Sequence, residues 1–486
     1  MSKPPMTEIR EDAQSPVARD LGNWTTLLRP PHLAVTTVLA GGTALHAINI
    51  YLVTAMLPSV VADLGGLRFY AWNTTLFMFA SVVMSALVPK CLASFGPRNS
   101  YRLAFAAFAL GTFACAAAPD MAVLLVGRTV QGVGGGLLVG LSYAMISATL
   151  PAPLWTRAAG ILSAMWGVGT LVGPALGGAF AQWGQWRIAF LLLVPFAIAV
   201  ALLLRSTMPG ARAGNETAPV AYGNLALVAA AVLAVSVTSL SRQALVNFGG
   251  LVAAALLLGL FIHRERTRSR RLLPPTAFTP GSPLRLLYAT LAVLVVASTT
   301  EIFVPFYGQE LGGAAPLAAG FLGAAIAAGW TVGSMASAAW TDKARLLVGI
   351  GPVVSAVGLT GMAVMSWPSA SLVTVLLWAV LLFVAGSGVG IAWPHMSAAA
   401  MTVGETPQEK NTAASSITTV QLVATSLGAA LAGTVTNLTG VGGNATEIGH
   451  SAQWLYGTFA VIVLCGVLFA HRVIGERSRK HTEAES

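Results

Sequence analysis

GILSAMWGVGTLVGPALGG, residues 160–178, is an apolar stretch that contains no charged residue, six glycines and one proline. Gly169, Gly173 and Gly177 are four residues apart, so they share one face of a helix, where small residues let a neighbouring backbone approach closely. Pro174 removes one backbone hydrogen bond and bends a helix that contains it. The stretch therefore predicts a bent and closely packed membrane helix.

The composition is that of a polytopic membrane protein. Of the 486 residues, 56% are hydrophobic and 9% are charged, whereas roughly 25% are charged in an ordinary soluble domain. The net charge of +10 comes from basic residues in short loops, so we expect no nucleic-acid partner. Cys91, Cys115 and Cys465 lack metal-ligand spacing, and we expect free thiols, no metal site and no cofactor. Because no catalytic motif is present, we do not expect an enzyme.

Apolar runs long enough to cross about 30 Å of hydrocarbon, roughly 20 residues each, follow one another along the chain. Two sets of six runs enclose a middle pair, which predicts fourteen transmembrane helices. The first set lies at 34–57, 69–89, 101–118, 121–149, 157–182 and 187–205, the middle pair at 223–241 and 246–263, and the second set at 285–308, 315–340, 346–367, 370–398, 412–436 and 452–473.

Loop charge predicts the orientation, because Lys and Arg accumulate on the cytoplasmic side. With the N-terminus inside, the outer loops hold only Arg68, Arg187 and Arg242, and Arg128 lies within a span. This distribution predicts an even number of spans in a bacterial inner membrane, with both termini cytoplasmic. Twelve spans with the middle pair on the membrane surface fit it equally well, but two fully apolar stretches joined by a short loop favour a crossing hairpin.

Several motifs carry a resemblance to a known family. Six positions match the fifth-helix signature of drug/proton antiporters in the major facilitator superfamily, namely Gly160, Gly169, Gly173, Pro174, Gly177 and Gly178. In the fourth span, Arg128 and Gln131 of GRTVQGVGGG resemble the superfamily's Arg-x-x-Gln-Gly signature. QWRIAFLLLVP at residues 185–195 and the middle hairpin resemble the fourteen-helix antiporter subgroup.

The resemblance implies an all-α major facilitator fold with two six-helix bundles and an inserted two-helix hairpin. We expect an N-terminal cytoplasmic tail at 1–33, an N-terminal bundle at 34–206, a linker with the two extra helices at 207–284, a C-terminal bundle at 285–475 and a cytoplasmic tail at 476–486.

The chain departs from the subgroup at two places. Of the usual cytoplasmic gate loop, the first half keeps only Gly96 and Arg98, and the second half keeps Asp342 and Lys343. Asn49 stands where the subgroup usually has an acid, so the first span lacks that proton-binding group.

Glu301, in LVVASTTEIFVPFYGQ, is the only carboxylate well inside a predicted span. An ionised side chain at mid-membrane costs about 2.5–3.5 kcal/mol, and burial favours the protonated carboxyl group, so we predict that Glu301 carries a coupled proton. The alternatives are a structural ion pair and a position near the outer mouth of the span.

Two further residues are candidates for proton coupling. Arg128 is predicted to modulate proton transfer through its electric field, and its alternative role is to anchor a helix end. His46 is predicted to relay protons, and a neutral histidine bonded to a neighbouring helix is its alternative. The predicted substrate cavity is lined by polar and aromatic side chains that orient or stack on a ligand, namely Asn49, Tyr51, Gln131, Trp330 and Gln421.

Together these features predict a monomeric secondary active transporter. It would export a small lipophilic or amphipathic compound, such as a drug, in exchange for protons by alternating access. Its partners would be this small molecule, protons and the lipid bilayer. Uptake or uncoupled facilitation of a metabolite is one alternative, and a non-transporting membrane sensor on a transporter fold is another.

Overall fold

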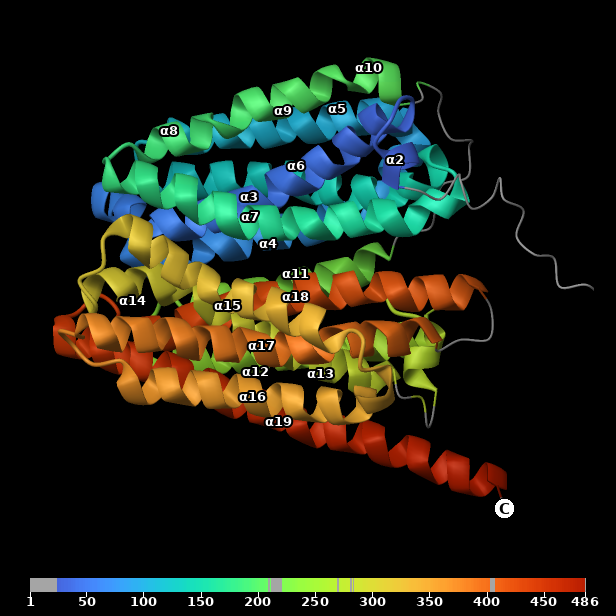
Figure 1. Ribbon diagram of the computed structural model, residues 1–486. Helices are drawn as coiled ribbons and strands as arrows, with labels where there is room; N and C mark the ends of the chain where they lie inside the picture. Colours follow the sequence, from blue (N-terminus) through green and yellow to red (C-terminus); the bar gives the residue numbers. More distant parts are fainter. Residues whose placement is uncertain are drawn as a thin grey trace, which may run out of the picture.

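The chain folds into a set of long, nearly parallel helices (Figure 1). The computed structural model describes residues 24–208, 210, 221–268, 271–279, 282, 284–402 and 407–485, and no strand occurs among them. The all-α expectation is confirmed for this part of the chain. Most of the expected N-terminal tail and part of the expected linker lie outside the described residues.

The helices have the following bounds in chain order, where η marks a 3-10 helix. They are α2 (Trp24–Leu27), α3 (His32–Leu64), η1 (Leu67–Phe69), α4 (Tyr70–Ala86), α5 (Val88–Ala116), α6 (Met121–Thr149), η2 (Ala152–Leu154), α7 (Trp155–Gln182), α8 (Trp186–Leu191), α9 (Leu193–Leu202), α10 (Leu204–Thr207), α11 (Tyr222–Thr238), α12 (Ala244–Thr267), η3 (Pro275–Phe278), α13 (Leu284–Ser298), η4 (Thr299–Phe303), α14 (Val304–Glu310), α15 (Pro316–Ser337), η5 (Thr341–Lys343), α16 (Ala344–Met365), α17 (Leu372–Thr402), α18 (Pro407–Thr439) and α19 (Ala445–Glu485).

Two bundles lie as layers, one above the other in Figure 1. In the N-terminal bundle, formed by α3 to α10, α3 packs on α6 and α7, and α5 packs on α6. In the C-terminal bundle, formed by α13 to α19, α17 packs on α15 and α16, and α19 packs on α13 and α16. We call the end of the molecule that contains Asp63 and Arg187 the Asp63 end, and the opposite end, which contains Arg98, the Arg98 end.

Eleven of the described helical segments are long and apolar enough to cross a membrane, when α8 to α10 are taken together as one segment and α13 to α14 as another. Leu67–Ala86 and Val88–Ala116 pass the same test only as a pair, which bends by 76° at its break, and α11 is an apolar helix of 17 residues. These segments correspond to the second, third and seventh expected spans. Because two of them are short and α5 begins with basic residues, the total of fourteen spans stays a prediction.

The expected gate loop at residues 89–102 is helical on both sides of Gly96. This glycine changes the direction of α5, and its φ of 73° lies in the left-handed region that favours glycine. Arg98 follows the kink and donates from Nε to Met208 O (3.0 Å) and from Nη2 to Arg205 O (3.1 Å). Arg98 therefore bonds to the end of its own bundle.

α7 packs closely on α3 through the glycines of the 160–178 stretch. A Cβ atom placed on Gly169 would lie 2.8 Å from the carbonyl carbon of Ala47, and one on Gly177 would lie 2.2 Å from Leu52 O. The two backbones approach so closely that no side chain fits between them. α7 also continues through its internal proline as a single helix.

The glycines at the two ends of this stretch have different surroundings. Gly160 is exposed, and a Cβ atom there would meet only the ring of Trp24 at 3.9 Å. Gly178 faces the other bundle, because a Cβ atom there would lie 2.7 Å from Leu317 Cα in α15. The stretch therefore packs on α3 and α15 with its second half.

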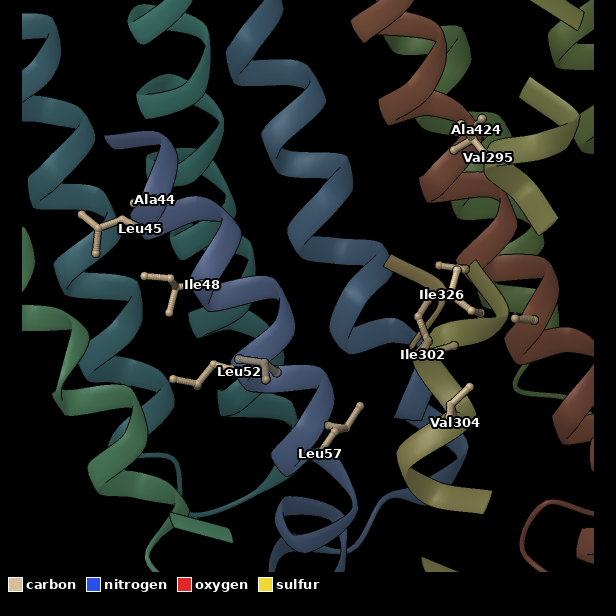
Figure 2. Packing of buried hydrophobic residues seen from close by; sticks show 14 of the residues in the cluster. Ala44, Leu45, Ile48, Leu52, Leu57, Val295, Ile302, Val304, Ile326 and Ala424 are labelled. Atoms are coloured by element: carbon tan, nitrogen blue, oxygen red, sulfur yellow. The ribbon is translucent and has the colours of Figure 1, made fainter. Parts of the chain in front are cut away.

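α3 is the most enclosed of the described spans, because 83% of the residues in an apolar 18-residue stretch of this helix are buried. Figure 2 shows Ile48 and Leu52 of α3 among the helices of the N-terminal bundle, and Ile302 and Val304 in the other bundle. All four side chains belong to one continuous apolar core. The apolar core therefore extends through both bundles.

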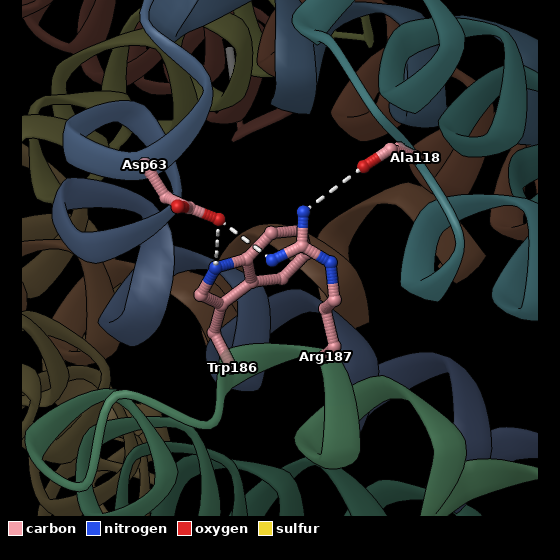
Figure 3. A network of polar contacts seen from close by, with 4 residues as sticks. All are labelled: Asp63, Ala118, Trp186 and Arg187. Carbon is pink, nitrogen blue, oxygen red and sulfur yellow. Dashed lines mark hydrogen bonds and ion pairs between the residues drawn. The ribbon is translucent and has the colours of Figure 1, made fainter.

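An ion pair fixes the end of α3 to α8 (Figure 3). Arg187 Nη1 lies 2.6 Å from Asp63 Oδ2, which also accepts a hydrogen bond from Trp186 Nε1 at 3.1 Å. Arg187 Nη2 donates to Ala118 O at 3.2 Å, and its guanidinium carbon lies 4.1 Å from the Trp186 ring centroid. The end of α3, the loop between α5 and α6 and the start of α8 are thereby tied together at the Asp63 end.

The bundles meet along two seams in the half of the molecule toward the Asp63 end. In the α7–α15 seam, Gly178 of α7 contacts Leu317 of α15, and beside it a Cβ atom on Gly320 of α15 would lie 2.9 Å from Ala55 Cβ of α3. In the α4–α18 seam, a Cβ atom on Gly433 of α18 would lie 2.7 Å from Ala71 Cβ of α4, and beside it the Tyr70 ring stacks on Phe303 of η4 with 4.7 Å between centroids. The Asp63 end is therefore closed between the bundles.

Candidate functional site

Arg128 is a buried cation inside the N-terminal bundle, with 1% of its surface exposed. Its Nη1 donates to Gln131 Oε1, its Nε lies 3.4 Å from Asn73 O, and its guanidinium carbon lies 4.2 Å from the Phe77 ring centroid. Gln131 in turn donates from Nε2 to Thr112 Oγ1 at 2.8 Å. The planar guanidinium is thus fixed between α4 and α6, and its partner Gln131 is bonded to α5.

The glycines of α6 create the space for this network. A Cβ atom on Gly134 would lie 2.2 Å from Phe108 N, and one on Gly136 would lie 2.3 Å from Ser81 O. α6 therefore lies directly on the backbones of α4 and α5, which lets Arg128 reach across a short gap. This local packing explains why GRTVQGVGGG combines a charge with four closely spaced glycines after it.

His46 also packs against the Phe77 ring. Its ring centroid is 5.3 Å from that of Phe77 and 5.7 Å from that of Trp166, and 1% of its surface is exposed. His46 Nδ1 points at Gly135, where a Cβ atom would lie 2.8 Å away, and it has no hydrogen-bond partner among the described residues. Of the predicted proton-coupling residues, the structure therefore brings Arg128 and His46 to one aromatic ring.

Two buried asparagines add polar groups to this bundle. Asn49, predicted from the sequence, and Asn73, which sequence reasoning missed, are both 0% exposed. Neither side-chain amide has a hydrogen-bond partner among the described residues. A buried amide without a hydrogen-bond partner costs free energy of folding. Asn49 and Asn73 therefore place polar groups inside this bundle at the expense of stability. The signal for Asn73 is a lone amide in the apolar run YAWNTTLFMF.

Glu301 lies in the C-terminal bundle, in the 3-10 turn η4 that separates α13 from α14. The hydroxyl groups of Ser298, Thr299 and Thr300 each bond to the carbonyl three residues earlier, at 2.8, 2.7 and 3.0 Å, and Pro305 follows at the start of α14. These local bonds compete with the α-helical pattern and favour the tighter turn. Glu301 is half-buried there.

The Glu301 carboxyl group faces the other bundle. It has no ion-pair partner among the described residues, and it lies within electrostatic range of the Tyr51 hydroxyl group of α3. Tyr51 is half-buried, and its Cβ is 2.6 Å from where a Cβ atom on Gly173 would lie. Gly173 therefore sets Tyr51 beside the seam at which Glu301 meets α3.

The remaining predicted cavity residues come from the C-terminal bundle. Trp330 of α15 packs against Trp393 of α17 with 4.9 Å between ring centroids, and Gln421 of α18 is half-buried. Among the described residues, no hydrogen bond or ring contact joins Tyr51, Trp330 and Gln421 to one another. The structure therefore distributes these residues over three helices and does not gather them into one contact cluster.

The predicted gate residues of the second half lie at the Arg98 end. Asp342 and Lys343 form the exposed turn η5, and Lys343 Nζ lies 5.7 Å from the Trp340 ring centroid. No ion pair links Asp342 to a basic residue in the described part of the chain. That part also contains no group of three or more His, Cys, Asp or Glu residues that could hold a metal ion.

Residues 39–432 match the family model of the Major Facilitator Superfamily. The chain belongs to this superfamily. It is 43% identical over 465 residues to proteins named "Probable multidrug-efflux transporter" from the CDC 1551 and H37Rv strains of Mycobacterium tuberculosis, with 94% of this chain and 97% of each relative covered. Major facilitator proteins are transporters and not enzymes, so the chain is a multi-pass membrane transporter of a small molecule.

Solved major facilitator structures have the same fold. A bacterial homolog of the human lysosomal transporter Spinster, in an inward-facing conformation, has a TM-score of 0.65 at 14% identity and covers 92% of this chain and 98% of its own. A D-xylose-proton symporter has a TM-score of 0.60 at 15% identity and covers 90% and 97%. At these identities the likeness concerns the fold alone.

Proposed function

We propose that this major facilitator protein exports a small lipophilic or amphipathic compound in exchange for protons, with Glu301 as the proton carrier. The observation that carries the proposal is the position of Glu301. A half-buried carboxyl group without an ion-pair partner among the described residues, in a turn between two helix segments, is able to gain and lose a proton as its surroundings change. The name of the mycobacterial relatives supports the direction of export.

Arg128 and His46 have supporting parts in this proposal. Arg128 holds a permanent positive charge near the centre of the N-terminal bundle, and His46 shares the Phe77 ring with it. When the bundles rock against each other, the field of Arg128 at Glu301 changes, which favours proton release on one side. The loop charges support a bacterial inner-membrane protein whose Asp63 end faces outside and whose termini are cytoplasmic. We also propose that a single copy carries out transport.

The test is proton movement in vesicles that contain the wild type, Glu301→Gln or Glu310→Gln. Glu310 is the matched control, because it is an exposed carboxylate at the end of α14, outside the seam. Lipophilic cations, neutral drugs and weak acids are added in turn. We expect at least one compound to release protons with the wild type and with Glu310→Gln, and not with Glu301→Gln. Equal proton release with all three proteins would contradict the assignment of Glu301.

Uncoupled facilitation of a metabolite is a second candidate, and Asn49 favours it. This residue is fully buried where the resembling subgroup has an acid, so the first span offers no second proton-binding carboxylate. In the same vesicles, this candidate predicts that a compound moves down its gradient at the same rate with and without a proton gradient. Glu301→Gln would then leave the flux unchanged.

A further inference from the structure

The α11–α12 hairpin occupies the α4–α18 seam. α11 contacts α18 of the C-terminal bundle and α4 of the N-terminal bundle, and it lies between the two layers in Figure 1. An additional pair of spans that served only to lengthen the chain would gain nothing from contact with both bundles. The position of the hairpin therefore raises the question of which bundle it moves with.

Apolar packing fixes the hairpin to the C-terminal bundle. Ala231 and Val235 of α11, Ala254 of α12 and Ala430 of α18 form a separate buried cluster. Small side chains of this kind let three helices pack without gaps, which is the main source of helix association inside a membrane. The hairpin is therefore expected to move with α18.

A buried carboxylate fixes the Arg98 end of the hairpin. Glu265, 0% exposed, accepts a hydrogen bond from Asn224 Nδ2 and further bonds from the backbone N–H groups of Leu272 and Leu273, at 2.9 Å each. Ser416 of α18 donates to Leu272 O at 3.2 Å. Glu265 thereby joins α11, α12 and the segment that leads to α13, and Ser416 joins that segment to α18.

At the Asp63 end, the hairpin is bonded across the seam. Trp72 Nε1 of α4 donates to Ser236 O of α11 at 3.0 Å. Asn437 Nδ2 of α18 donates both to Arg68 O of η1 (3.0 Å) and to Ser239 O, just after α11 (3.1 Å). One amide and one indole therefore connect the N-terminal bundle, the C-terminal bundle and the hairpin at the Asp63 end.

The contact at the opposite end has a different character. There the exposed Lys90 ammonium group donates to the Tyr222 hydroxyl group and lies 5.0 Å from its ring centroid, beside an apolar groove lined by Leu87, Cys91 and Phe95. A long, solvated lysine side chain can change its conformation when its partner moves, with little change in free energy. An indole N–H that is bonded to a backbone carbonyl loses its bond when the seam opens.

We propose that the hairpin is part of the gate at the Asp63 end, and that Trp72 and Asn437 are the positioning residues that hold this gate closed. The hairpin travels with the C-terminal bundle, so the bonds from Trp72 to Ser236 O and from Asn437 to Arg68 O break when the α4–α18 seam opens, while the bond from Asn437 to Ser239 O stays within the moving part. This role is independent of the direction of transport and of proton coupling, so it does not rest on the function proposed above.

The experiment uses a cysteine reporter inside the gate. Ser239, 1% exposed, is replaced by the nearly isosteric cysteine in a Cys465→Ser background, because Cys465 is exposed. The full-length protein in lipid nanodiscs is treated with a water-soluble maleimide, and the rate of labelling at position 239 is measured. Nanodiscs give the reagent access to both faces, so the result does not depend on membrane orientation.

Two variants remove the gate bonds, and two matched variants remove similar bonds elsewhere. Asn437→Ala and Trp72→Phe act in the gate. Asn247→Ala removes an amide that donates to two carbonyls within the hairpin region, and Trp367→Phe removes an indole that donates to Val364 O within α16. Loss of one hydrogen bond changes an opening equilibrium by about fivefold, so we expect each gate variant to label about fivefold faster and each control to label at the wild-type rate.

Equal labelling rates in the gate and control variants would overturn the proposal. Cys115, 0% exposed within the N-terminal bundle, reports on unfolding, because it is labelled only when that bundle opens. If Asn437→Ala exposes Cys115, Trp72→Phe provides the decision, since it keeps an aromatic ring in place and removes only the N–H donor. Thermal melting separates a general loss of stability, which gate and control variants share, from the faster labelling that only the gate predicts.

Discussion

Arg128 uses the shape of its side chain as well as its charge. Its Nε and Nη1 atoms bond in two directions while the guanidinium plane covers the Phe77 ring. Lysine keeps the charge but offers a single ammonium group, so we expect Arg128→Lys to lower the transport rate by about tenfold or more without preventing folding. Arg102→Lys is the control, since Arg102 is exposed and bonds only to Asn99. A full transport rate in Arg128→Lys would show that charge alone suffices.

Glu265 makes a testable contribution to stability. As a carboxylate it offers two oxygens to the N–H groups of Leu272 and Leu273, whereas glutamine has one oxygen and adds two donors. We expect Glu265→Gln to destabilise the protein by about 1–3 kcal/mol, because a buried backbone N–H loses its acceptor. Thermal melting in detergent measures the change. The exposed Glu310→Gln variant should melt like the wild type.

At this scale the sequence predicted the charged residues better than the amides. Arg128 and Glu301 stand out in the sequence, because an ionised side chain in an apolar run costs free energy whether it faces lipid or protein. Asn73 does not stand out from Thr75, whose hydroxyl bonds to the carbonyl of Ala71 within its own helix. One local carbonyl cannot satisfy both donor hydrogens and the acceptor oxygen of an amide, but whether the amide faces lipid or protein depends on how α4 packs on α6. That packing belongs to the tertiary structure, which the local sequence does not show.

The glycine face of α7 is the element-scale feature with the sharpest test. A methyl group on Gly177 would overlap Leu52 O, whereas a methyl group on Gly167, in the same stretch, would meet nothing within 4 Å. We expect Gly177→Ala to lower stability by about 1–3 kcal/mol and Gly167→Ala to leave it unchanged or slightly higher. The comparison is made by thermal melting. Similar effects of both substitutions would mean that α7 does not rest on α3 through this face.

The spacing of four predicted which glycines share a face, and it did not predict what each face meets. Gly160 belongs to the same family signature, but it lies nine residues before Gly169, which places it on the opposite face of α7, where it is exposed. The turn η4 was equally hidden. LVVASTTEIFVPFYGQ looks like one apolar span, and the 3-10 geometry arises from three consecutive hydroxyl bonds that only the folded backbone reveals.

Rigid-body rocking of the bundles predicts which cross-links stop transport. Ala55 of α3 and Gly320 of α15 face each other between the two bundles, beside the α7–α15 seam, with 2.9 Å between Cβ positions, whereas Ala47 and Gly169 face each other within the N-terminal bundle at 2.7 Å. In a cysteine-free background, a disulfide at either pair needs a shift of about 1 Å or somewhat more. We expect Ala55→Cys with Gly320→Cys to stop transport until the disulfide is reduced.

The pair within the bundle is the control for this prediction. Ala47→Cys with Gly169→Cys should transport equally well when oxidised and when reduced, because the N-terminal bundle moves as one body. Transport measurements before and after a reducing agent give the result. If oxidation of the cross-seam pair left transport unchanged, the α7–α15 seam would not open during the cycle.

The two-bundle architecture followed from the repeat of six apolar runs, since each run must find partners inside the membrane. The place of the hairpin did not follow. Length and loop charge are the same whether Tyr222–Thr238 leans on α4, on α18 or on lipid, and the choice depends on the small-residue cluster around Ala430. Hydrogen bonds such as that from Trp72 to Ser236 join residues 164 positions apart, beyond the reach of local patterns.

If Glu301 carries the coupled proton, as proposed above, it also sets an upper limit on how steep a substrate gradient the membrane voltage can maintain. It is the sole carboxylate away from the helix ends in the described membrane helices, so a cycle driven by this group alone exchanges one proton for one substrate molecule. A membrane voltage supplies about 2.3 kcal/mol per charge per 100 mV, and about 1.4 kcal/mol corresponds to a tenfold concentration ratio. One proton therefore sustains about a fiftyfold gradient of a neutral compound at 100 mV. At equal pH on the two sides, a steeper steady-state gradient would require a second proton carrier, and His46, which shares the Phe77 ring with Arg128, is a titratable group in the N-terminal bundle.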